Sequence, residues 1–178
     1  MCRAGADHAL TRAAKLASLL ETSFRENLMR RFTDATFSEG EEIYGTYRLV
    51  SSTQRYVETG EVVTSSRDNG FLTYGRDGRM MVIIVGDDRP KPESAENMTD
   101  QARVQLYQSL VAYGGAFKFD GKTVEHHVDI SWNEIWTGTT QFRDMKRDGE
   151  RLSISTRLAP NARNGRIAVT TLLWEKLK

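Results

Sequence analysis

A series of Asx-Gly dipeptides constrains this chain most, because the dipeptides separate short runs of β-favouring residues. They are Asp68-Asn69-Gly70, Asp77-Gly78, Asp120-Gly121, Asp148-Gly149 and Asn164-Gly165. Asn, Asp and Gly tolerate the positive φ angles that tight turns require, so such pairs are the strongest short-range signal for β-hairpins. From Ile43 onward the hydrophobic period is two. The sequence therefore predicts antiparallel strands joined mostly by hairpins.

About nine strands can be delimited between these turns. They are Tyr44–Ser52, Glu61–Ser65, Phe71–Arg76, Met80–Val85, Gly115–Phe119, Thr123–Ile130, Thr137–Lys146, Arg151–Arg157 and Ile167–Leu173. A sheet of this size would leave two edges open to aggregation unless it closes on itself. We therefore expect a mainly β domain over residues 43–178, a closed antiparallel up-and-down barrel of about eight to ten strands.

Two helices are expected beside the strands. Residues 9–33 lack Pro and Gly and carry apolar residues at three- and four-residue steps, so residues 1–42 are predicted to form a helical extension. This helix could pack on the barrel wall, cover the barrel mouth or form a dimer contact. The stretch from Thr99 to Ala112 has mainly helical spacing, with Thr99 as a plausible N-cap, and is expected to plug or flank one barrel end.

Composition narrows the function classes. The chain has 178 residues, a net charge of +1 and one cysteine. Balanced charge gives no field that would recruit nucleic acid or an acidic membrane, and the longest apolar run, Met80–Val85, is far too short to span a bilayer. An intramolecular disulfide is excluded and no signal-peptide pattern is present, so we expect a cytoplasmic protein.

The run Met80–Val85 itself is typical of a strand packed on both sides, with a Met-lined pocket wall as the second interpretation.

Several motifs, taken together, resemble the bacterial and fungal lipocalin-like domain family, a calycin-type β-barrel. They are Gly45–Val50, Leu72–Tyr74 with Asp77–Met80, Ala112–Phe117, Val124–Val128, Trp136–Thr139 followed by Gln141 and Arg143, Asp148-Gly149 with Leu152, and Trp174-Glu175. Tyr47 stands where the family commonly has Trp, residues 51–70 are less typical, and residues 9–33 lie outside the match. The resemblance implies a barrel with an interior pocket. Some members are encoded among genes for small-molecule biosynthesis, but the family implies no single reaction.

His126 is the leading candidate for a functional side chain. Neighbours on a strand point to opposite faces, so the apolar face with Val124, Val128 and Ile130 should carry His126 inward and leave His127 in solvent. A buried His stays neutral and suits hydrogen bonding or proton transfer. The alternatives are a core histidine bonded to a neighbouring hydroxyl or carbonyl, a ligand contact, or a general acid or base. The adjacent histidines cannot chelate one metal ion, so no metal site is expected.

The polar and aromatic residues of other strands complete the predicted pocket. Gln141 and Arg143 share one strand face, and if this face points inward they would offer the pocket an amide and a cation. An inward Arg would need a partner, either an acidic side chain or an anionic or phenolate-like ligand. The alternative for this pair is an outer polar face or a structural ion pair. Large rings are expected in the core or on the pocket wall, where Tyr and Trp also offer a polar group; these are Tyr74, Tyr113, Phe117, Trp136 and Trp174.

These features favour a binding protein for a small, partly apolar or aromatic molecule, without a cofactor. The alternative is a cofactor-free isomerase, cyclase or lyase acting on a biosynthetic intermediate in the same cavity. His126 would then move a proton, Tyr74 or Tyr113 would donate a hydrogen bond, and Arg143 would stabilise negative charge. A third hypothesis is a stress or assembly role through the 9–33 helix, for which a homodimer is one arrangement.

Overall fold

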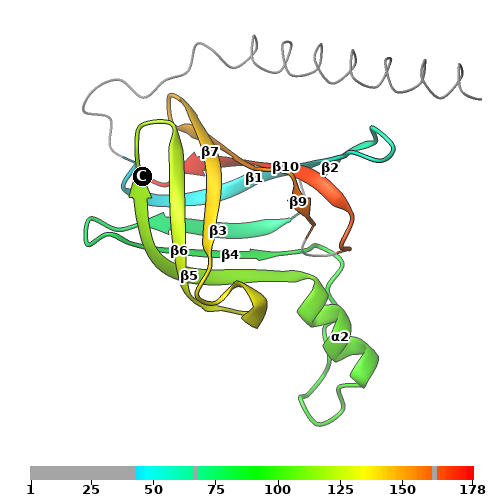
Figure 1. Cartoon of the computed structure of the whole chain (residues 1–178). Coiled ribbons are helices and arrows are strands. Elements are labelled where there is room, and N and C mark those ends of the chain that lie inside the picture. The colour runs from blue at the N-terminus through cyan, green and yellow to red at the C-terminus, as the bar shows by residue number, and fades with distance from the viewer. Residues whose placement is uncertain (1–42, 66–67, 162–163) are drawn as a thin grey trace, which may run out of the picture. The chain divides into compact units, whose positions relative to one another are not determined.

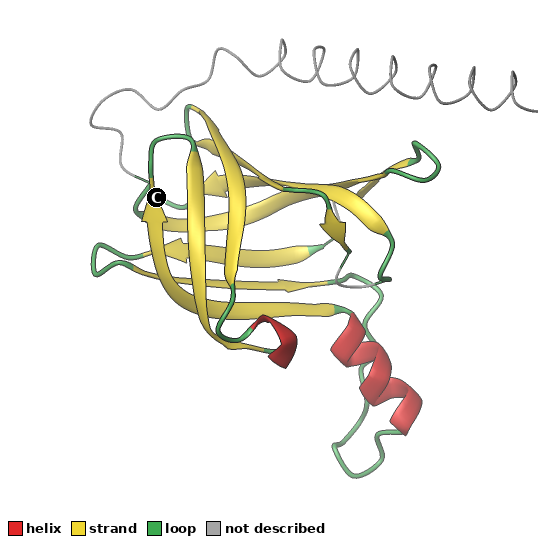
Figure 2. Cartoon of the chain, viewed as in Figure 1, coloured by secondary structure: helices red, strands yellow, loops and turns green. Residues whose placement is uncertain are grey.

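The described part of the chain folds into a closed antiparallel β-barrel (Figures 1 and 2). The computed structural model describes residues 43–65, 68–161 and 164–178. Eight strands form the barrel in the order β1, β3, β4, β5, β6, β7, β8, β10, and pairing of β1 with β10 closes it. Short strands β2 and β9 pair with β1 and β10. The strands are β1 (Gly45–Tyr56), β2 (Val62–Ser65), β3 (Asn69–Tyr74), β4 (Arg79–Val85), β5 (Leu110–Phe119), β6 (Thr123–Ser131), β7 (Thr140–Asp148), β8 (Arg151–Thr156), β9 (Ala159–Pro160) and β10 (Ile167–Lys176).

The expected barrel is thus confirmed, and most Asx-Gly steps form turns. Gly78 joins β3 to β4 with φ +78°, and Gly149 joins β7 to β8 with φ +57°, conformations that favour glycine. Asn69-Gly70 is the exception. It lies inside β3, where Asn69 pairs with Val85 and Gly70 with Ile84 of β4. The prediction of a turn at this dipeptide was wrong. Gly70 instead allows β3 to lie close to β4, because a Cβ there would lie 2.6 Å from the Ile83 carbonyl oxygen.

Two β-bulges change which residues face the interior. In β1, Leu49 opposes Trp174 and Ser51 opposes Leu173, so Val50 is an extra residue. Inward positions are therefore odd-numbered before the bulge and even-numbered after it. In β6, Ile130 pairs with Gly114 of β5 and Val128 pairs with Gly115, so Asp129 between them is an extra residue. Ile130, expected on the inner face, is 69% exposed for this reason.

Strand β4 alternates in spite of its continuous apolar sequence. Met80, Val82 and Ile84 are buried inside the barrel, whereas Met81 is 70% exposed and Ile83 is exposed too. The expectation that both faces of this strand are packed was wrong. The described residues include no second layer over this wall, so the outward apolar side chains contact solvent.

The inserted helix is shorter than expected and does not plug the barrel. Helix α2 (Asp100–Gln108) begins after Thr99, whose Oγ1 accepts a hydrogen bond from the Ala102 amide, so the N-cap is confirmed. None of its residues is buried, and it extends away from the barrel end (Figure 1). Residues 110–112, expected in the helix, begin β5 instead. The predicted helix at 9–33 lies outside the described residues. No helix within the described ranges has the length and apolar character needed to cross a membrane.

Candidate functional site

A cavity of about 130 Å³ lies inside the barrel, at the end where β9 and the short helix η1 (Glu134–Trp136) are found. An engineered protein cavity of about 150 Å³ accepts benzene, so the volume suits a compact ring. The lining residues come from most of the barrel strands. They are Ser52, Gln54, Asp68, Val82, Ile84, Val111, Tyr113, Trp136, Gln141, Arg143, Thr156, Ala159, Pro160, Asn161, Ala168, Thr170 and Leu172.

The cavity has a polar side built from one row across four strands. Gln54 of β1 pairs with Thr170 of β10, and Arg143 of β7 pairs with Thr156 of β8. The two pairs meet where the Thr170 amide donates to Thr156 Oγ1 at 3.0 Å. All four side chains line the cavity. Cross-strand neighbours on one face of a sheet lie side by side, so these residues form a continuous polar strip.

The opposite side of the cavity is apolar. Val82 and Ile84 of β4 and Val111 of β5 supply aliphatic groups. Trp136 of η1 packs edge-on against Tyr113, with ring centroids 5.5 Å apart. A small ligand would therefore meet hydrocarbon on one side and hydrogen-bonding groups on the other, the usual character of a small-molecule site.

Arg143 stands at one end of the polar strip. Its Nη1 donates to the Phe142 carbonyl at 2.9 Å, and its Nη2 donates to Gln141 Oε1 at 3.3 Å. Gln141 in turn donates through Nε2 to Thr139 Oγ1 at 2.9 Å, which fixes its amide with the oxygen toward the guanidinium. Arg143 also faces the Tyr113 hydroxyl, whose pKa its charge and hydrogen-bonding groups lower. The sequence-based expectation that Gln141 and Arg143 face inward is met by this geometry.

Behind the cavity wall, His126 joins two tyrosines. It is 2% exposed; its Nε2 lies 2.8 Å from the Tyr74 hydroxyl and its Nδ1 lies 2.9 Å from the Tyr113 hydroxyl. A neutral imidazole donates from one nitrogen and accepts at the other, so it satisfies both hydroxyls at once. If Tyr113 accepts from Arg143, its own proton is directed to Nδ1, and Nε2–H then donates to Tyr74. Together with Arg143 on the cavity side, these three hydrogen-bonded residues form one polar chain from the cavity into the core.

Burial keeps this chain neutral apart from Arg143. Desolvation lowers the pKa of His126 to about 3, and the charges of Arg143 and His127 act in the same direction. Desolvation also raises the pKa of Tyr74 well above 10, with the nearby Tyr113 as a smaller cause. Burial raises the pKa of Tyr113, and the charge and hydrogen bond of Arg143 offset part of that rise. At neutral pH, His126 is therefore uncharged and both tyrosines are protonated.

His127 has a separate, outer position. It is half-buried on the opposite face of β6, where its Nδ1 lies 3.0 Å from Thr140 Oγ1 and its Nε2 lies 3.5 Å from Glu125. The expected opposite orientation of the two histidines is confirmed. Within the residues that the structure describes, no cluster of three His, Cys, Asp or Glu side chains could hold a metal ion.

The structure brings four of the eight predicted site residues to the cavity. They are Tyr113, Trp136, Gln141 and Arg143. Trp136 was expected on a strand, but it lies on the short helix η1. His126 and Tyr74 do not line the cavity themselves. His126 hydrogen-bonds the Tyr113 hydroxyl, and Tyr74 in turn hydrogen-bonds His126.

The two remaining predicted residues do not line the cavity. Phe117 packs on Tyr74 with ring centroids 4.8 Å apart. Trp174 is 1% exposed in the barrel core, and its indole N–H has no hydrogen-bond acceptor among the described residues. Both aromatic rings therefore belong to the packing of the barrel.

Sequence reasoning missed most of the polar strip. Gln54 and Ser52 turn inward only because of the bulge at Val50, which no pattern in the sequence reveals. Asp68 was interpreted as a turn residue, yet it is buried and accepts a hydrogen bond from Ser52 Oγ at 2.8 Å. Thr156 and Thr170 share strand faces with the apolar residues two positions away, Ile154 and Leu172, and this was the one signal that could have identified these two positions.

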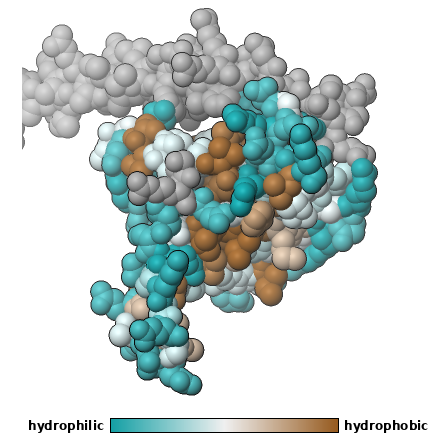
Figure 3. All heavy atoms as spheres, turned by 180° about the vertical axis from the view of Figure 1, so that it is seen from behind, coloured by the Kyte–Doolittle hydropathy of each residue, from teal (hydrophilic) through white to brown (hydrophobic). Residues whose placement is uncertain are grey.

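A second hollow lies on the outside of the barrel, with a volume of about 860 Å³. It runs over the outer faces of β3 to β6, where Ala112, Gly114 and Gly115 leave a shallow floor beside exposed Met81 and Ile83. Strands β3 and β4 lie behind β6 and β7 in Figure 1, and the view from behind shows apolar surface on the barrel wall (Figure 3). The charged residues that line this outer hollow, Asp77 and Arg79, are exposed to solvent. The interior cavity is therefore the better candidate site.

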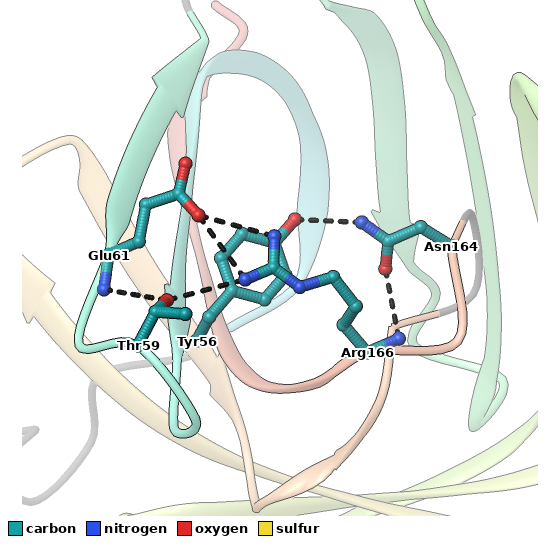
Figure 4. Close-up of polar contacts among 5 residues, drawn as sticks. All are labelled: Tyr56, Thr59, Glu61, Asn164 and Arg166. Atoms are coloured by element: carbon teal, nitrogen blue, oxygen red, sulfur yellow. Dashed lines mark hydrogen bonds and ion pairs between the residues drawn. The ribbon is translucent and has the colours of Figure 1, made fainter.

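A cluster of polar contacts links two loops near the cavity (Figure 4). The Arg166 guanidinium lies over the Tyr56 ring, 3.7 Å from its centroid, and donates to Glu61 Oε2 at 3.2 Å and to Thr59 Oγ1 at 3.3 Å. Asn164 donates through Nδ2 to the Tyr56 hydroxyl at 2.9 Å. The cluster thus joins the β1–β2 connection to the segment that precedes β10.

We expect Arg166→Gln to lower the free energy of unfolding by about 1 kcal/mol, because it removes a cation–π contact together with a partly exposed ion pair. The matched control is Arg151→Gln, which breaks only the exposed 3.7 Å pair with Glu175 and should change the free energy by less than about 0.5 kcal/mol. Urea denaturation of both variants measures the difference. Equal effects would show that the ring contact contributes nothing.

Comparison with known proteins agrees with this architecture. A family model described as a lipocalin-like domain matches residues 44–177 of the chain. No curated protein matches the sequence.

Proposed function

Because this chain belongs to the lipocalin-like domain family, we propose that it binds a small, partly apolar molecule inside the barrel. The observation that carries the proposal is the two-sided interior cavity, in which a polar strip that ends at Arg143 faces an aliphatic and aromatic wall. Contact with the apolar wall would contribute roughly 25 cal/mol per Å² of apolar area removed from water. The polar strip would set the orientation of the ligand.

The contacts of His126 favour binding over acid–base catalysis. Both of its ring nitrogens are engaged by tyrosine hydroxyls, it does not line the cavity, and its pKa of about 3 makes it a weak base at neutral pH. No contact of His126 supports the isomerase, cyclase or lyase alternative. The cytoplasmic location, a homodimer contact and the expectation of neither nucleic-acid nor membrane partners stay predictions from the sequence.

We expect native mass spectrometry of the protein, purified from its native source, to show a small organic molecule that denaturation releases. Thr170→Phe should abolish this bound mass, because the new ring points into the cavity. Thr171→Phe is the matched control: the neighbouring side chain faces outward, where Thr171 Oγ1 lies 2.9 Å from Ser155 Oγ, so the bound mass should persist. Repeated absence of any bound molecule from the unmodified protein would contradict the proposal, as would retention of the ligand by Thr170→Phe.

A further inference from the structure

Building on the proposed function, we infer that the natural occupant of the cavity is a compact anion whose carboxylate, or a similar oxygen anion, pairs with Arg143. The inference names a ligand class that the barrel fold by itself does not specify. It rests on the contacts of the guanidinium, on the charge of its surroundings and on the shape of the apolar wall.

The guanidinium retains unused hydrogen-bonding capacity. An arginine has five N–H donors in a planar fork. Within the described part of the chain, the acceptors of Arg143 are the Phe142 carbonyl and Gln141 Oε1. Even with one further donor directed to the neighbouring Tyr113 hydroxyl, two donors are left for a ligand on a side chain that lines the cavity. A carboxylate matches the fork geometry better than any neutral group does.

The charge of Arg143 is also uncompensated by its neighbours. Both of its acceptors are neutral, and no carboxylate of the described residues lies within ion-pair distance of the guanidinium. Desolvation keeps His126 uncharged and Tyr113 protonated, so neither supplies a negative charge at neutral pH. The carboxylate of Asp68 also lines the cavity, but it accepts a 2.8 Å hydrogen bond from Ser52 and forms no ion pair with Arg143. An anionic ligand would therefore supply the negative charge that no described neighbour places beside Arg143.

The wall opposite Arg143 limits the remainder of the ligand. Val82, Ile84 and Val111 present only hydrocarbon, and the Trp136 ring stands beside them. A volume of about 130 Å³ accommodates one ring or a short branched chain, but not an extended lipid tail. The ligand class is thus a small aromatic or aliphatic acid.

Benzoate and benzamide form a matched pair of probes, because they share shape and ring but differ in charge. At pH 7, isothermal titration calorimetry should show benzoate binding about tenfold or more tightly than benzamide, because a carboxylate accepts two parallel hydrogen bonds from the guanidinium and carries the opposite charge, whereas the amide is neutral. Arg143→Gln should remove this preference, so that the variant binds the two probes with similar affinity. Arg157→Gln is the control. Its exposed guanidinium lies outside, 4.6 Å from the Phe142 ring centroid, and its loss should preserve the preference.

Three results would overturn the inference. Equal affinity for the two probes would leave a binding cavity without anion selectivity and would spare the proposed function. A benzoate preference that survives Arg143→Gln would place the anion elsewhere. Failure of both probes to bind at millimolar concentration would contradict the compact-acid class. If the natively purified protein nevertheless carries a small molecule, the proposed function stands, and if it carries none, both fail.

Discussion

Acidification from pH 7 to pH 4 is expected to lower the free energy of unfolding by about 3 kcal/mol through His126 alone. Its pKa is about 3 in the folded protein and about 6.5 in an unfolded chain. Between these values the unfolded state binds the proton and the folded state does not, so stability falls as the pH falls. The contribution is fully present above pH 6.5 and is lost as the pH drops toward 3. Its physical origin is burial between Tyr74 and Tyr113, which leaves no room for solvation of an imidazolium.

A pair of variants isolates this contribution from the ordinary titration of carboxylates. His126→Gln retains a donor and an acceptor but does not titrate, so its stability should fall about 3 kcal/mol less than that of the unmodified protein between pH 7 and pH 4. His127→Gln removes the neighbouring, half-buried histidine, the smallest cause of the lowered His126 pKa, and should change the pH dependence far less than His126→Gln does. Guanidinium denaturation at several pH values gives these slopes. If His126→Gln does not fold, imidazole NMR of the unmodified protein must show His126 neutral at pH 5, and a protonated ring there would contradict the account.

Gly115→Ala is expected to lower the free energy of unfolding by about 3 kcal/mol or more. A Cβ at Gly115 would overlap the backbone carbonyl of His127, and its next neighbours are also backbone atoms of β6. No side-chain rotation can relieve such an overlap, so the two strands would have to separate. The site coincides with the β6 bulge, which turns Ile130 outward and precedes the segment carrying Trp136. The substitution should therefore also weaken ligand binding.

Gly114→Ala is the control for this prediction. The Cβ at that position would meet the Met81 side chain at 3.0 Å and the Met80 carbonyl at 3.2 Å, contacts that a flexible methionine and a small shift can relieve. Both substitutions restrict the unfolded chain equally, so the difference between them reports the native overlap. Chemical denaturation should place Gly114→Ala within about 1 kcal/mol of the unmodified protein. Similar losses for the two variants would mean that glycine is needed here for general flexibility and not for close strand approach.

The barrel could be predicted from the sequence because its determinants are local. Turn dipeptides such as Asp77-Gly78 and Asp148-Gly149 close hairpins between adjacent strands, and a Thr cap marks the start of α2. Hairpin connections also determine the order of most strands. Only the closing pair β1–β10 is remote in sequence, and the need to cover open edges made it predictable.

The site was only partly predictable, because it depends on how faces alternate over long distances. Arg143 and Gln141 follow simple alternation and were placed correctly. Ser52 and Ile130 lie beyond bulges, and one inserted residue reverses the face of everything that follows. The contacts of His126 with Tyr74 and Tyr113 join three strands, so the choice between a core histidine and a ligand-binding one required the tertiary structure.

Methyl NMR of the protein titrated with benzoate tests most directly whether the ligand lies inside the barrel. Alternation along β4 gives the measurement its contrast, because Val82 and Ile84 face the cavity whereas Ile83 faces outward over the second hollow. A ligand inside the barrel should give intermolecular NOEs from the benzoate ring to the methyl groups of Val82, Ile84, Val111 and Leu172. NOEs to Ile83 and Met81 without any to these four residues would contradict this placement, because the ligand would then bind on the outer wall.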